Sequence, residues 1–129
     1  MTRSVLDASA LLTYLRQELG WEQVRQAFTG STTMTSVSFG EVAGWMVRNG
    51  ADEATVRALR DGLVYPLTPV DDLAVRAALL KPLILSKGPG IGDRLCLALA
   101  ARTTAVALTA NAWLAEVAGA VGVEVQLIR

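Results

Sequence analysis

The chain has 129 residues, the usual length of one domain, which allows one substantial core and is too short for two. Its twelve basic and twelve acidic side chains cancel, so the net charge favours no class of charged partner. The absence of histidine excludes any mechanism that needs an imidazole base, and the single cysteine excludes a disulfide within the chain. We therefore predict one domain over residues 1–129.

Apolar residues are abundant, at 52% of the chain. We interpret them as a buried α/β core plus an apolar surface covered by a second copy, which predicts a homodimer. The longest apolar run, Leu95 to Ala101, is about a third of a membrane span, so we expect a cytoplasmic protein without membrane contact. Within that run Cys96 is expected to be a small core residue, because no histidine is present to activate its thiol.

The first predicted element is a short strand over Ser4–Leu6, which ends at Asp7. Leucines at helical spacing then predict a helix over Ala8–Leu19. Asp7 thus stands between a strand and a helix. It has two interpretations at this point, a cap of the helix or an acidic site residue at the strand end.

Short strands and helices alternate through the rest of the chain. Helical periodicity with start and stop signals predicts helices at Trp21–Phe28, Phe39–Arg48, Asp52–Gly62, Thr68 to about Leu85, Asp93–Arg102 and Ala112–Ala118. Extended segments are predicted at Thr32–Val37, Val64–Leu67, Ala105–Leu108 and Val123–Ile128. Ser38 is the expected cap of the helix that begins at Phe39, and Lys87–Gly92 form a glycine-rich loop. This alternation predicts an α/β fold with three α/β/α layers around a mostly parallel central sheet.

Several polar residues lie at the carboxyl ends of predicted strands, which is where open parallel sheets form their ligand-binding and catalytic sites. Asp7 and Asn111 follow predicted strands, and Asp93 begins a helix that such a sheet can bring to the same edge. Each of these three has a plainer interpretation as a helix cap. Glu41 lies in the apolar stretch Val-Ser-Phe-Gly-Glu-Val-Ala-Gly-Trp and has two interpretations. It is either a site carboxylate, which is costly to desolvate, or part of an exposed helix face that it shares with Arg48.

Convergence of Asp7, Glu41 and Asp93 would require a counter-charge. Two carboxylates about 4 Å apart repel by roughly 4 kcal/mol at an effective dielectric constant of about 20. With no histidine and an inert thiol, the remaining ligands are oxygens, which suit Mg²⁺ or Mn²⁺ better than structural zinc. A cation held in this way polarises a phosphodiester and activates water, so hydrolysis of nucleic acid is the chemistry that these residues favour.

Four stretches in this order carry a resemblance that spans almost the whole chain. They are Ser-Val-Leu-Asp-Ala-Ser-Ala-Leu-Leu, Thr-Ser-Val-Ser-Phe-Gly-Glu-Val, Gly-Ile-Gly-Asp-Arg-Leu-Cys-Leu-Ala-Leu-Ala, and Leu-Thr-Ala-Asn-Ala-Trp followed by Gly-Val-Glu-Val-Gln-Leu-Ile-Arg. The chain resembles the PIN domain, and most closely the VapC-type toxins of bacterial toxin–antitoxin pairs. The order, the spacing and the total length make the match specific.

The resemblance implies a small α/β sandwich around a parallel sheet and a divalent-metal-dependent endoribonuclease. A VapB-like antitoxin would wrap this toxin and block its site. Asp7, Glu41 and Asp93 match the family's acidic positions, and the resemblance implies that Asp7 and Asp93 hold Mg²⁺ or Mn²⁺. Thr109 matches a hydroxyl found near that pocket, and Asn111 takes the last position of the catalytic set.

The sequence departs from the resemblance at Asn111, where many relatives carry aspartate. One ligand charge is therefore missing, although the amide keeps a carbonyl oxygen that can contact a cation or water. An alternative function is a catalytically weakened PIN-like module that only binds a partner. A phosphatase with an aspartyl nucleophile also places an acid after its first strand, but here Ser9 stands where its second acid belongs. The basic residues are scattered, and Arg94 is the best single candidate for a phosphate contact with RNA.

Overall fold

A computed structural model describes residues 3–83 and 90–129 of the chain. Within these residues, five parallel strands form one sheet in the order β3-β2-β1-β4-β5. The strands are β1 (Arg3–Leu6), β2 (Ser31–Thr35), β3 (Leu67–Thr68), β4 (Val106–Thr109) and β5 (Val125–Leu127). The predicted parallel sheet is confirmed.

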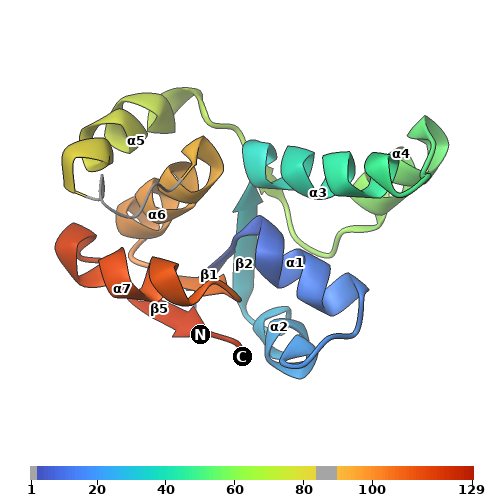
Figure 1. Cartoon of the computed structure of the whole chain (residues 1–129), viewed down its shortest axis with the longest axis horizontal. Coiled ribbons are helices and arrows are strands. Elements are labelled where there is room, and N and C mark those ends of the chain that lie inside the picture. Colours follow the sequence, from blue (N-terminus) through green and yellow to red (C-terminus); the bar gives the residue numbers. More distant parts are fainter. Residues whose placement is uncertain (1–2, 84–89) are drawn as a thin grey trace.

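The helices form a layer on each side of this sheet. They are α1 (Ala8–Leu15), α2 (Trp21–Ala27), α3 (Ser36–Arg48), α4 (Glu53–Gly62), α5 (Ala74–Leu80), α6 (Ile91–Thr103) and α7 (Ala112–Val121), with 3₁₀ turns at Asp71–Leu73 and Lys81–Leu83. Figure 1 shows α1 to α4 on one side of the sheet and α5 to α7 on the other. The predicted three-layer α/β/α architecture is therefore confirmed. None of the helices in the described residues combines the length and the hydropathy that a membrane-spanning helix needs.

Each face of the sheet has its own hydrophobic core, because successive strand residues point to opposite faces. Val5 and Ala107 face α6 and α7, while Leu6 and Leu108 face α1 and α3. Helix α6 is buried along its middle, as its apolar sequence predicts, and Cys96 has no exposed surface there. The thiol is a core group, as expected from the sequence.

Several predicted boundaries differ from the observed ones, and two of them are wrong for a reason that the backbone shows. Helix α1 ends at Leu15 and does not continue to Leu19, whose side chain is 80% exposed. Gln17 and Gly20 take positive φ angles of 54° and 98°, so the chain reverses where the leucine spacing predicts a further turn of helix. The strand predicted from Val64 begins only at Leu67, since Pro66 has no N–H to donate to a neighbouring strand.

The predicted helix caps also differ from the observed ones. Thr35 caps α3, because its side-chain oxygen accepts the Ser38 backbone N–H at 3.0 Å and the helix begins at Ser36. Ser38 is therefore a first-turn residue of α3 and not its cap. Thr68 belongs to β3 and caps no helix, and α5 begins only after the 3₁₀ turn. The predicted end of that helix near Leu85 and the loop residues 87–89 lie outside the described residues.

The strand order defines where a ligand site is expected. The chain runs outward from β1 to β2 and β3 on one side, and later returns to place β4 and β5 on the other. The connections leaving β1 and β4 therefore diverge to opposite faces of the sheet. In open α/β sheets, this switch point opens a crevice at the carboxyl ends of the two strands.

Candidate active site

The site lies at the switch point between β1 and β4. Leu6 pairs with Leu108 in the parallel register, so the residues that follow these two strands emerge side by side. Asp7 follows β1 directly, and its backbone N–H donates to the Leu108 carbonyl at 3.2 Å. Thr109 is the last residue of β4. Two residues that are distant in the sequence thus meet at one edge because of the sheet topology.

The Asp7 carboxylate accepts three hydrogen bonds. The Ser9 hydroxyl at 2.7 Å and the Ala10 backbone N–H at 2.9 Å donate to Oδ1, and the Thr109 hydroxyl donates to Oδ2. Asp7 is the N-cap of α1 and only 2% of its surface is exposed. The cap interpretation of Asp7 is therefore confirmed, and the same residue lies at the carboxyl end of β1, where the second interpretation places a site residue.

Burial raises the pKa of Asp7, because the low-dielectric interior disfavours the charged form. The hydrogen bonds from Thr109, Ser9 and Ala10 act in the opposite direction and lower that pKa. The result is a carboxylate whose orientation is fixed by donors on both oxygens. Such an arrangement holds a ligand oxygen in place and leaves its remaining lone pairs for another partner.

Glu41 reaches the same edge from α3. The residue is exposed on its helix, but its carboxylate lies against the first turn of α6, where a β-carbon on Gly92 would come within 2.0 Å of Oε1 and 2.8 Å of Cδ. Partial desolvation raises the pKa of Glu41, and repulsion by Asp93 and then Asp7 raises it further. The exposed position predicted as an alternative is therefore compatible with a role at the site.

Asp93 lies in the first turn of α6 and is not its N-cap, a position that Gly90 occupies. Burial is the main cause that raises the pKa of the Asp93 carboxyl, followed by repulsion from Asp7, while a hydrogen bond with the Gly90 backbone lowers it. The start of a helix favours negative charge, since its backbone N–H groups are unpaired and point outward. The alternative of a simple cap is wrong, although the helix terminus does support the carboxylate.

The three acidic side chains lie close enough to influence one another electrostatically. Repulsion links Asp7 to Asp93 and both to Glu41, and burial followed by the three charges raises the pKa of the Cys96 thiol beneath them. In the described residues, none of the salt bridges involves any of the three. These three carboxyl groups, here called the acidic rim, therefore have no salt bridge to a basic side chain in the described parts of the chain.

This donor set fits a hard divalent cation, because it consists of carboxylate and hydroxyl oxygens whose charges repel one another. Over residues 3–83 and 90–129, no three or more acidic or cysteine side chains are arranged to hold a metal ion directly. Few protein ligands with several retained waters are the usual arrangement for Mg²⁺. The residues thus suit a loosely held ion better than a closed metal cage.

Asn111 lies at the same edge, two residues beyond β4. It occupies the N-cap position of α7, but its side chain makes no capping hydrogen bond. Its backbone N–H donates to the Thr109 hydroxyl oxygen at 3.0 Å. The side-chain amide of Asn111 is therefore not held in place by a hydrogen bond to the start of α7.

Ser9 is a site residue that the sequence analysis did not identify. Its hydroxyl donates to Asp7, accepts the Ala110 backbone N–H at 2.9 Å, and lies 3.3 Å from the Thr109 hydroxyl oxygen. Only its place two residues after Asp7 could have indicated it. Arg94 has a structural contact, because its guanidinium donates to the Ala77 carbonyl of α5 at 3.3 Å.

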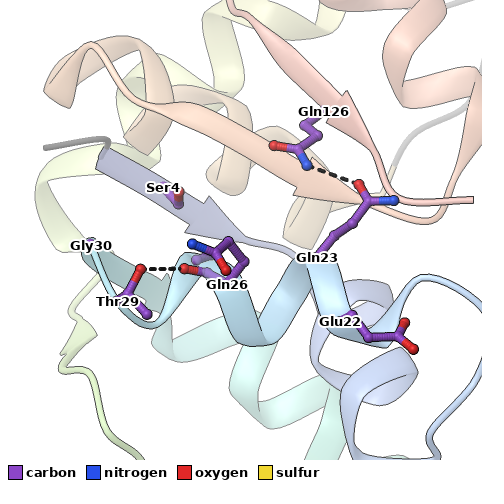
Figure 2. Close-up of a pocket in the computed structure, with 8 residues that line it drawn as sticks. Ser4, Glu22, Gln23, Gln26, Thr29, Gly30 and Gln126 are labelled. Atoms are coloured by element: carbon purple, nitrogen blue, oxygen red, sulfur yellow. Dashed lines mark hydrogen bonds between the residues drawn. The ribbon is translucent and has the colours of Figure 1, made fainter.

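A separate pocket of about 500 Å³ lies between α2 and strands β1 and β5. Figure 2 shows Gln126 of β5 donating to Gln23 of α2, an interaction of 2.9 Å between Nε2 and Oε1. The pocket is lined by Ser4, Glu22, Gln23, Gln26, Ala27, Thr29, Gly30 and Gln126. None of the predicted site residues lines it, so the acidic rim and this pocket are different places on the molecule.

Comparisons with known proteins agree with the fold. The family described as the PIN domain matches residues 4–120, and no curated protein matches the sequence. Among solved structures, the crystal structure of PAE2754 from Pyrobaculum aerophilum is similar, with a TM-score of 0.58 and 17% sequence identity. The similarity covers 90% of this chain and 86% of that chain. At this identity, the structural likeness bears on the fold alone.

Proposed function

Because the chain belongs to the PIN-domain family, whose members are generally metal-dependent nucleases, we propose that it is a Mg²⁺- or Mn²⁺-dependent endoribonuclease of the VapC type. The observation that carries the proposal is the meeting of Asp7 and Thr109 at the switch point of the sheet. Glu41 and Asp93 add like charges at the same edge. These residues form an acidic, oxygen-rich rim that suits a cation, and the cation would offset the repulsion between the rim and an anionic phosphodiester.

The residues of the chain have distinct roles in this proposal. Asp7 and Asp93 hold the cation. Glu41 and Asn111 orient the attacking water beside it, and the negative charge of Glu41 adds to the attraction for the ion. When bound, the ion polarises the phosphodiester and lowers the pKa of a coordinated water. Thr109 and Ser9 keep the Asp7 carboxylate in one orientation through hydrogen bonds to its two oxygens. Preorganised ligands of this kind avoid the cost of ordering them during the reaction.

The direct test combines metal binding with cleavage. Calorimetry with Mn²⁺ should show saturable binding that Asp93→Asn weakens, and the wild-type protein should cleave RNA only when the ion is present. Asp61→Asn is a matched control, because Asp61 is an exposed acid on α4 paired with Arg60. Cleavage that survives chelation of divalent ions would contradict the proposal.

A VapB-like antitoxin and a homodimer are further parts of the proposal. They are supported by large apolar side chains that stand exposed in the described residues, at Leu19, Val64, Val75 and Leu79. A small open reading frame for a DNA-binding protein directly upstream would support the antitoxin. Induced expression should be toxic and Asp7→Ala should abolish the toxicity, whereas light scattering should give twice the mass of the chain.

Asn111 favours a second candidate function, a PIN-like module that binds a partner without cleaving RNA. The rim lacks one negative charge there, and the described acids form no ready metal cluster. Metal binding separates the two functions. Absence of Mn²⁺ binding at millimolar concentration would favour the interaction module.

A further inference from the structure

Gly92 is buried in the first turn of α6 although it has no side chain to bury. The atoms nearest to a β-carbon placed on Gly92 belong to Glu41 of α3, a residue 51 positions earlier in the numbering. A β-carbon on Gly92 would lie 2.0 Å from Oε1, 2.8 Å from Cδ and 3.2 Å from Oε2 of that carboxylate. The Glu41 carboxylate therefore occupies the space where any other residue would carry its first side-chain atom.

The nearby glycines of α3 and of the start of α6 do not share this environment. A β-carbon on Gly40 or Gly44 of α3, or on Gly90 before α6, would meet no atom within 4 Å. Gly92 also has no positive φ angle, so its backbone does not require glycine. The feature that distinguishes Gly92 is the contact with Glu41.

We infer that Gly92 is a positioning residue, whose missing side chain lets the Glu41 carboxylate lie at the start of α6 beside Asp93. Glu41 belongs to an exposed part of α3, so without the contact at Gly92 its long side chain samples many rotamers in solvent. The unpaired N–H groups and the dipole at the start of α6 favour a carboxylate there. The role assigned to Glu41 toward a cation rests on the proposed function.

The test is a double-mutant cycle on Gly92→Ala and Glu41→Ala, read by Mn²⁺ affinity and by thermal unfolding. An added methyl group pushes the carboxylate aside, so Gly92→Ala should weaken Mn²⁺ binding about tenfold in the wild-type background. In the Glu41→Ala background the methyl group meets no carboxylate, and the affinity should change less than about twofold. Gly40→Ala is the matched control for a methyl group added to a helix next to Glu41, and it should leave the affinity unchanged.

The thermal transitions give a readout that does not depend on metal or RNA. Alanine is a better helix former than glycine, so Gly92→Ala should raise Tm clearly when Glu41 is already alanine, and raise it less or lower it when Glu41 is present. An equal change of Tm in both backgrounds would overturn the inference. An equal change of Mn²⁺ affinity in both backgrounds would do the same.

Failure of the proposed function gives a different pattern. If the wild-type protein binds no Mn²⁺ or cleaves no RNA while the Tm values still couple, the nuclease proposal fails and the contact between Gly92 and Glu41 stands. If Mn²⁺ binds and RNA is cleaved but neither cycle shows coupling, the nuclease proposal stands and the role of Gly92 is refuted.

Discussion

The Thr109 hydroxyl donates a hydrogen bond to Oδ2 of Asp7, which joins the ends of β4 and β1 across 102 positions of sequence. The same hydroxyl oxygen accepts the Asn111 backbone N–H at 3.0 Å. Thr109 has no exposed surface, so water cannot replace either interaction without opening the structure. One buried hydroxyl thus couples the acid, the strand and the loop that leads to α7.

Replacement of Thr109 by valine tests this coupling. Thr109→Val keeps the shape but leaves the Asn111 N–H and one Asp7 oxygen without their buried partner, which should cost about 2 kcal/mol of unfolding free energy. Thr109→Ser is the control, because it keeps the hydroxyl and loses only a methyl group, at about 1 kcal/mol. Urea unfolding measures both variants. A smaller loss for valine than for serine would show that the hydroxyl is not the stabilising group.

Asp7→Asn is predicted to separate activity from stability. The amide keeps the cap oxygen for the Ala10 N–H but removes the charge that holds the cation, so RNA cleavage should fall by about a thousandfold. The fold should persist with similar stability at neutral pH, because the removal of one repelling charge offsets the loss of the hydrogen bond that Thr109 donates to Oδ2. Cleavage of a labelled RNA and thermal unfolding measure the two effects. Retained cleavage would refute the role of Asp7.

The pH dependence of stability follows from the acidic rim. Unfolded aspartate and glutamate titrate near 3.8 and 4.5. Burial raises the folded pKa values of Asp7, Asp93 and Glu41 above these, and repulsion by the neighbouring carboxylates raises those of Asp93 and Glu41 further. At a pH between the unfolded and the folded pKa of each group, the folded state binds more protons than the unfolded state. The acidic rim therefore favours folding most at low pH, and this contribution is lost as the pH rises through the folded pKa values.

Other carboxylates act in the opposite direction, for example Asp52, whose pKa is lowered by hydrogen bonds from Thr55. The difference between the wild-type protein and Asp7→Asn isolates the rim. In metal-free buffer, the stability of Asp7→Asn relative to wild type should increase as pH rises from 4 toward neutrality. Added Mn²⁺ should reduce that difference, because the ion stabilises the charged form of the wild-type rim. Denaturant unfolding at a series of pH values measures it, and a difference that grows toward low pH would contradict the raised pKa of Asp7.

Gly20 is predicted to be essential for stability for two reasons. Its φ angle is 98°, and a β-carbon there would lie 2.0 Å from the Ile128 carbonyl oxygen. Gly50 has a similar φ of 100° but an open surrounding, so it separates the backbone effect from the steric one. Gly50→Ala should cost about 1 kcal/mol, and Gly20→Ala about 3 kcal/mol or more. Thermal unfolding of the two variants compares them, and equal losses would mean that the contact with Ile128 relaxes without cost.

Asn111→Asp adds the acid that the resemblance to other PIN domains places at this position. A fourth carboxylate should tighten Mn²⁺ binding by about tenfold and increase RNA cleavage, while it lowers the stability of the metal-free protein through added repulsion. Calorimetry and a cleavage assay measure both effects. An unchanged Mn²⁺ affinity would place Asn111 outside the metal-binding rim.

Much of the fold could be predicted from short-range patterns. The alternation of strands and helices predicted the three layers, and the apolar sequence from Leu95 to Ala100 predicted the buried middle of α6. The exact ends failed where backbone geometry overrode side-chain periodicity, as at Gln17 with its positive φ angle. The prediction of cap residues failed for a similar reason, because serine is the more favoured cap by type and yet the path of the chain makes Thr35, and not Ser38, the cap of α3.

The sequence by itself determined which side chains could perform chemistry, because without histidine only carboxylates, amides and hydroxyls remain for a cation. It also placed Asp7 and Asn111 after strands, since strand periodicity is a local property. Only the tertiary structure decided that Thr109 holds the Asp7 carboxylate and that Glu41 lies over Gly92. These contacts join segments that are distant in the chain, and they exist because the strand order puts β1 beside β4 and brings α3 against α6.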